Sequence, residues 1–278
     1  MGVKPERLLA DIRTRKSFSA RGCLALAFSV FVLLGTAGLR GQTVAAEASI
    51  STDRPSVTNS SVVVSKGNFQ VENGLLITNT QGQYIFDFPE TALRFGLFDK
   101  TEFRLSAPNY FHSLSTEAAA TSGFGDITIG VKQQLGPTSR NFNLSFILFL
   151  SLPSGANAVS SHGYDPGLQL PWSHQLSKNW TAGGQVAFYW PSQEGKHNFT
   201  GEATFLLDRQ LTKPWDAFVE YAGDFPQNGG SRQLLHFGTT YKLAPRHQID
   251  FHVAAGLSKA APEMFVGLGY SFLLRVAK

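Results

Sequence analysis

The sequence has 278 residues, of which 16% are charged and 12% aromatic, and its formal net charge is +4. The basic excess lies in the first 46 residues, which hold seven Lys or Arg and two Asp or Glu and leave 17 basic and 18 acidic residues in the remainder. A net charge of −1 on that remainder argues against a nucleic-acid partner. The single cysteine, Cys23, also lies in the first 46 residues, so the rest of the chain can form neither a disulfide nor a thiolate metal site.

Residues 1–46 have the pattern of a secretory signal peptide. Basic residues precede an apolar stretch from Cys23 to Leu34, and Val44 and Ala46 stand where small residues precede a cleavage site. The apolar stretch is shorter than the roughly 20 residues that a membrane-spanning helix needs. We therefore expect a cleaved leader, with an uncleaved N-terminal anchor as the alternative.

Beyond the leader, apolar residues recur at every second position, which is typical of β-strands. Phe69 and Ile77 lie on the apolar face of the first predicted strand, which residues 84–98 follow as a second strand. A third strand is predicted over residues 101–106 and a long polar connection over residues 112–122. The later predicted connections alternate between short turns at 136–138, 177–179, 212–214 and 244–246 and longer loops at 152–164, 191–198, 224–230 and 258–263.

The last strand, residues 264–276, shows the alternation most clearly. Apolar residues from Met264 to Val276 occupy one face, and the other face is mostly small, with Gly267, Gly269 and Ser271. Such a C-terminal strand is common in bacterial outer-membrane barrels, and we expect the barrel-assembly machinery to bind it. About twelve strands of spanning length, with short turns on one side and long loops on the other, predict an all-β chain that forms a transmembrane antiparallel up-and-down barrel. A soluble secreted β-protein is the alternative.

Three stretches resemble a known family. Residues 52–55 (TDRP) together with residues 67–72 (GNFQVE), residues 123–126 (GFGD) followed by Gly130 and Lys132, and, less specifically, residues 164–167 (YDPG) are similar to motifs of the meta-pathway phenol-degradation family of bacterial outer-membrane "transporters". The resemblance implies an outer-membrane barrel that passes aromatic or other hydrophobic compounds.

The segment before the barrel, residues 47–66, is predicted to lie on the periplasmic side, and residues 67–278 are predicted to form the barrel itself. Asp53 and Arg54 in this segment are candidates for a plug or gate, with Arg54 ion-paired into the lumen. The alternative is a segment that folds under the barrel and only stabilises it, because an ion pair can offset the entropy cost of ordering it.

Charged residues of both signs fall on the predicted inward faces, since a charge on the lipid face would be costly. They either line a water-filled pore and select solutes or form a structural network across a packed interior. The candidates are Arg94, Glu102, Arg104, Asp126, Lys132, Glu202, Asp208, Glu220, Asp250 and His252. Inward Ile147, Phe149, Leu206 and Phe218 form either a hydrophobic solute path or filler.

We predict no enzyme, no catalytic residue, no metal and no cofactor, because the sequence contains neither a G-x-S-x-G nor an H-E-x-x-H motif. The predicted function is passive uptake of small, hydrophobic or aromatic solutes through the outer membrane of a Gram-negative bacterium. A closed structural or adhesive barrel acting through its external loops is the alternative, and a lipid-modifying enzyme is a third. The expected partners are these solutes and the lipid or lipopolysaccharide of the outer membrane.

Overall fold

The computed structural model describes residues 49–115, 119–139, 141–193 and 195–276, so the leader predicted over residues 1–46 lies outside the described residues. Among the residues described, no helix is long and apolar enough to cross a membrane. The strands are β1 (Asn68–Thr80), β2 (Gln83–Phe88), β3 (Ala92–Phe98), β4 (Thr101–Ser106), β5 (Tyr110–Leu114), β6 (Thr121–Phe124), β7 (Ile127–Gln134), β8 (Phe142–Leu152), β9 (Asp165–Gln175), β10 (Trp180–Tyr189), β11 (Ser192–Gln193), β12 (Lys196–His197), β13 (Thr200–Gln210), β14 (Trp215–Pro226), β15 (Arg232–Ala244), β16 (His247–Gly256) and β17 (Met264–Arg275).

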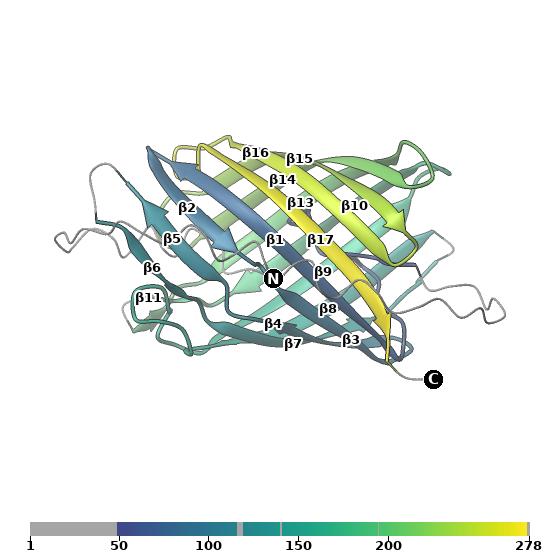
Figure 1. Ribbon diagram of the computed structural model, residues 1–278, viewed down its shortest axis with the longest axis horizontal. Coiled ribbons are helices and arrows are strands. Elements are labelled where there is room, and N and C mark those ends of the chain that lie inside the picture. Colours follow the sequence, from purple (N-terminus) through teal and green to yellow (C-terminus); the bar gives the residue numbers. More distant parts are fainter. Residues whose placement is uncertain (1–48, 116–118, 140, 194, 277–278) are drawn as a thin grey trace.

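The strands form a closed antiparallel barrel with twelve strands around its circumference, which confirms the predicted fold class and strand number. Closure comes from β1 and β17, which pair along their whole length from Asn68 opposite Arg275 to Asn79 opposite Met264. Figure 1 shows these tilted strands, with β17 in yellow beside β1. The predicted alternation of β17 is confirmed, since Leu268 is exposed on the outer face and Ser271 is buried.

Three neighbouring strands of the barrel are interrupted and continue past the interruption as β2, β5 and β6. The predicted single strand over residues 84–98 is therefore wrong, because β2 ends before Pro89, whose ring nitrogen carries no hydrogen to continue the ladder. The chain stays attached to β1 there, since the N–H of Gly74 donates to the carbonyl of Pro89 at 2.7 Å.

The long connection predicted over residues 112–122 is also wrong at both ends. β5 continues to Leu114 and β6 begins at Thr121, and the two strands pair with each other. Polar residues in these strands hide the alternation, but Phe111 on the inward face is buried against Ile85 and Val159. Tertiary packing thus extends two strands through a polar stretch.

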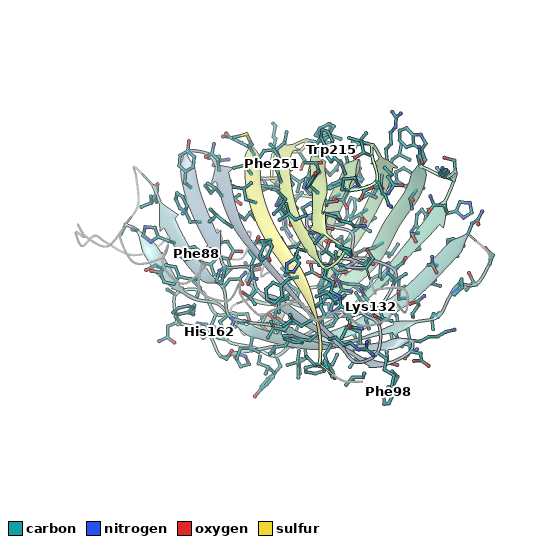
Figure 2. The ribbon with its side chains drawn as sticks, turned by 45° about the vertical axis from the view of Figure 1, so that its right-hand side comes forward. Phe88, Phe98, Lys132, His162, Trp215 and Phe251 are labelled. Atoms are coloured by element: carbon teal, nitrogen blue, oxygen red, sulfur yellow. The ribbon has the colours of Figure 1, made fainter. Side chains whose placement is uncertain are left out.

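The two faces of the wall differ in chemistry along the barrel. Apolar side chains are exposed on the outer face, as lipid contact requires, and they include Phe103, Val131, Leu148, Val186, Phe205, Val219, Phe237, Phe251 and Leu268. Figure 2 labels Phe251 and Trp215, which both lie on the outer face, and Lys132, which is fully buried. The inner face therefore carries the polar and charged groups.

The connections sort by length between the two ends of the barrel, except that the two-residue turn between β1 and β2 lies at the long-loop end. The short connections, such as that between Phe98 and Thr101, define the short-turn end, and the connections such as that from Leu152 to Asp165 define the long-loop end. Phe98 and His162 lie toward these opposite ends (Figure 2). Bacterial barrels place short turns in the periplasm and long loops outside, which orients the barrel. One predicted long loop, residues 191–198, contains the short hairpin of β11 and β12.

Candidate functional site

Residues 49–66, which we call the plug, lie inside the barrel. At one end the N–H of Ile50 donates to the carbonyl of Pro245, and at the other the N–H of Gly67 donates to that of Gly96, so both ends lie at the short-turn end. Between them the chain reaches Glu220 on β14, on the far side of the lumen. The plug therefore enters from the short-turn end, crosses the lumen and returns to begin β1. It does not fold beneath the barrel, as the alternative considered above would have it.

The backbone of the plug forms no strand, so its N–H groups need partners from the barrel wall. Side-chain carboxylates and amides that point inward accept these hydrogen bonds. The N–H groups of Asp53 and Arg54 donate to Glu72, those of Val57 and Thr58 to Glu220, that of Asn59 to Gln185, that of Val63 to Gln134 and that of Val64 to Glu102. Many of the polar side chains inside the barrel therefore serve as hydrogen-bond acceptors for the backbone of the plug.

Asp53 lies in a buried cluster of three cations and three carboxylates, which we call the Asp53 cluster. Arg94, Arg104 and Lys132 all pair with Asp53, at 3.4 Å for Arg94 and 3.1 Å for Lys132. Arg94 also pairs with Glu72 and Glu102, each at 2.7 Å, and all of these side chains are nearly or fully buried. The cluster has equal numbers of positive and negative charges, and their mutual attraction offsets the desolvation cost of burying them.

The charge state of Asp53 follows from this environment. Burial by itself raises the pKa of the Asp53 carboxyl, but the attraction of Arg104, Arg94 and Lys132 outweighs burial and lowers that pKa well below its usual value. Asp53 is therefore ionised at neutral pH, and it is the anion on which the three cations converge.

Arg54 points away from that cluster and pairs with two carboxylates, Glu90 in the interruption between β2 and β3 and Asp250 on β16. Its guanidinium lies 2.5 Å from Glu90 and 3.3 Å from Asp250, and it also donates to the carbonyl of Leu268. Gly269 leaves space for this side chain, because a Cβ at that position would collide with both Arg54 and Asp250. The small residues that the sequence shows on the inward face of β17 thus make room for the plug.

The opposite side of the lumen holds the plug mainly with uncharged groups. Thr58 Oγ1 lies 2.5 Å from Thr204 Oγ1 and 2.6 Å from Glu220, and Asn59 Nδ2 donates to Gln185 at 2.9 Å. Glu220 also bonds to His236, which in turn contacts His252 at 3.0 Å between ring nitrogens.

Asp126 and Glu202 are predicted lumen residues that bind partners outside the Asp53 cluster. Asp126 accepts hydrogen bonds from Gly155, Ser160 and Ser161, so it holds the loop between β8 and β9. Glu202 accepts hydrogen bonds from Gln185 and Tyr189 on the neighbouring strand β10.

Glu72, Glu90 and Gln185 bind the plug and its anchors but were not among the predicted site residues. The alternating pattern places Glu72 and Gln185 on the inward face, but it places many other polar residues there too and so does not single these two out. Nothing in the sequence distinguishes Glu90, which lies in the interruption between β2 and β3.

A cavity of about 590 Å³ lies on the long-loop side of the plug. Asp53 to Val57 line its floor, and loop residues such as His162 and Asn228 line its outer part. Its lining also includes the apolar side chains Leu76, Phe149, Val159 and Phe265, and the ring of Tyr189 packs 5.8 Å from that of Phe149. Of the other inward apolar residues, Ile147 and Phe218 are buried and Leu206 is half-buried.

Across the described ranges, no group of three or more His, Cys, Asp or Glu side chains is arranged to hold a metal ion. The arrangement can bind and orient a plug and can accept a small solute in the cavity above it.

Comparisons with known proteins agree with the fold. A family model with the description "Putative MetA-pathway of phenol degradation" matches residues 52–274, whereas no curated protein matches the chain. The COG4313 outer membrane channel from Pseudomonas putida F1 is similar with a TM-score of 0.58 and 13% identity over 76% of this chain and 97% of that one. The NanC porin gives 0.54 and 11% over 73% and 98%, and the KdgM porin gives 0.51 and 8% over 73% and 98%. At these identities the likeness shows the barrel fold.

Proposed function

Since the chain belongs to the family described as "Putative MetA-pathway of phenol degradation", we propose that it is an outer-membrane channel for passive uptake of small, hydrophobic or aromatic solutes. The family description supports the solute class, and the barrel fold with its apolar outer face supports the location.

The observation that carries this proposal is the plug beneath the cavity. The cavity combines apolar and aromatic side chains with a few polar groups, which suits a small aromatic molecule. Its floor is Asp53 to Val57, and the plug is hydrogen-bonded to strands on opposite sides of the lumen, such as β1 through Glu72 and β14 through Glu220. A solute that enters from the long-loop end therefore reaches the periplasm only when part of the plug moves.

In this proposal Asp53 and Arg54 are the fixed end of a gate. Arg94, Arg104 and Lys132 act on transport by holding Asp53, and Glu90 and Asp250 act by holding Arg54. No catalytic role is assigned to any residue in this proposal.

A closed structural barrel is the second candidate function, and the same ion pairs favour it. A plug held by a balanced, buried cluster can also serve only to fill the lumen, since breaking such a cluster is costly.

Single-channel recording in a planar bilayer separates the two. We expect the full mature chain to give small or rare current steps that added toluene or phenol blocks, and a variant lacking residues 51–63 to give steps several-fold larger. If the shortened barrel folds, as judged by its β-sheet circular dichroism, and still passes no current, the channel is contradicted and the structural barrel is supported. Large steps that neither aromatic compound affects would contradict the solute class alone.

A further inference from the structure

The short-turn end of the barrel carries a repeated pair of an apolar and a basic residue. Phe98 is followed by Lys100, Leu176 by Lys178, and Leu211 by Lys213, in three separate turns. These apolar side chains are exposed, with 64%, 55% and 43% of the surface of Phe98, Leu176 and Leu211 accessible. The strand ends at the same end of the barrel add exposed Leu135, Leu243 and Leu274.

Exposed charges at this end are almost all positive. The exposed cations are Lys66, Lys100, Lys178, Arg209, Lys213 and Arg275, and we call them, with the apolar residues of the preceding paragraph, the short-turn rim. Among the described residues of this end, Asp99 is the exposed acid. The long-loop end has fewer exposed charges in its described part, namely Lys196, Lys259 and Glu263.

The cations of the short-turn rim are not used within the barrel. None of them forms an ion pair with an acidic side chain in the described part of the chain. Arg209 stacks over the ring of Trp180 with its guanidinium carbon 5.1 Å from the ring centre, which places a cation beside an interfacial aromatic. Six exposed cations therefore lie at the end of the barrel where the apolar outer face meets water.

We infer that the short-turn rim binds the phosphate headgroups of anionic phospholipids, represented by phosphatidylglycerol, in the periplasmic leaflet of the membrane. The exposed Phe and Leu side chains contact the acyl chains next to the headgroups. The Lys stems lie along them and place their ammonium groups at the depth of the phosphates. Repetition of the pair from turn to turn distributes these contacts around the barrel rather than forming one pocket.

This inference rests on the orientation of the barrel but does not depend on whether the lumen conducts. Failure of the channel proposal in the bilayer recording would leave it standing, and failure of lipid binding would leave the channel standing.

The test uses the full mature protein in phosphatidylcholine vesicles that contain a trace of spin-labelled phosphatidylglycerol or spin-labelled phosphatidylcholine. Electron spin resonance gives the fraction of each lipid that the protein immobilises and so their relative association constant. One basic side chain near an anionic membrane surface strengthens association by roughly fivefold at physiological ionic strength. We expect the wild type to prefer phosphatidylglycerol by at least about twofold, and 1 M salt to weaken that preference because salt screens exposed charges.

The matched variants carry two substitutions each. Lys178→Gln with Lys213→Gln is expected to reduce the preference by half or more, whereas Lys196→Gln with Lys259→Gln at the long-loop end is expected to leave it unchanged. Lys178→Arg with Lys213→Arg keeps the charge and is expected to retain the preference. No preference in the wild type, or an equal loss in both glutamine variants, would overturn the inference.

Discussion

The plug is held by two sides of the same lumen that differ in chemistry. On the side of β1, β3, β4 and β7, Asp53 is fixed by Arg94, Arg104 and Lys132 in a balanced cluster of buried charges. On the side of β10, β13 and β14, Thr58 and its neighbours are held by hydrogen bonds to amide, hydroxyl and carboxylate groups.

The difference indicates where the plug can move. Removing one partner from a buried ion cluster leaves an uncompensated charge, whereas water entering from the cavity can replace the hydrogen bonds that Gln185, Thr204 and the Glu220 carboxylate make to the plug. Both sides border the cavity, since Asp53, Val57 and Asn59 all line it, so the chemistry that holds the plug decides between them. We therefore expect opening to begin at residues 57–61 while Asp53 stays bound.

The largest effect is expected from Asp53→Asn. The substitution leaves Arg94, Arg104 and Lys132 with only Glu72 and Glu102, so one buried positive charge loses its counterion. We expect the free energy of unfolding to fall by about 3–5 kcal/mol. Urea-induced unfolding in lipid vesicles, followed by tryptophan fluorescence, measures it. Asp99→Asn, in an exposed turn, is the matched control and should change stability little; an equally small effect of Asp53→Asn would mean that the cluster does not anchor the plug.

An intermediate effect is expected from Glu220→Gln. Glu220 accepts hydrogen bonds from the N–H groups of Val57 and Thr58 and from the Thr58 hydroxyl, and an amide offers one accepting oxygen in place of two. We expect a loss of about 1–3 kcal/mol in stability.

The same variant should also pass current more often than the wild type, because the released part of the plug lies below the cavity. Single-channel recording gives the open probability, with the exposed Glu263→Gln as control. Stability loss without any change in open probability would contradict opening at residues 57–61.

The smallest effect is expected from Asn59→Ala. The substitution removes the side-chain hydrogen bonds to Gln169 and Gln185 and the 3.3 Å bond that Arg104 donates to Asn59 Oδ1, but Arg104 keeps Asp53 as its partner and the N–H of residue 59 stays bonded to Gln185. A loss of about 0.5–1.5 kcal/mol in the free energy of unfolding is expected from the same urea experiment. Asn179→Ala in an exposed turn is the control, and a loss as large as that of Asp53→Asn would remove the proposed difference between the two sides.

The alternating pattern of the sequence was sufficient to predict the barrel, its twelve strands and the inward position of the polar residues. The pattern suffices because side chains of a strand point to opposite faces in turn, and lipid on one side makes the choice of face unambiguous. The pattern did not predict the interruption at Pro89, because a proline ends the hydrogen-bonded ladder whatever the alternation. It also did not predict the strands in which polar residues such as His112 and Ser122 continue a ladder.

The sequence by itself thus determined the fold class, the faces of the strands and many of the charges that lie inside, although not Glu90. Only the tertiary structure decided that residues 49–66 fill the lumen and that Asp53 and Arg54 bind different partners. Arg54 and Asp250, for instance, are 196 residues apart in the chain and 3.3 Å apart in space. Alternation specifies whether a residue lies on the inner or the outer face of the barrel. Which charged residues form ion pairs depends instead on closure of β1 onto β17 and on the path of the plug, an irregular segment that has no periodic pattern.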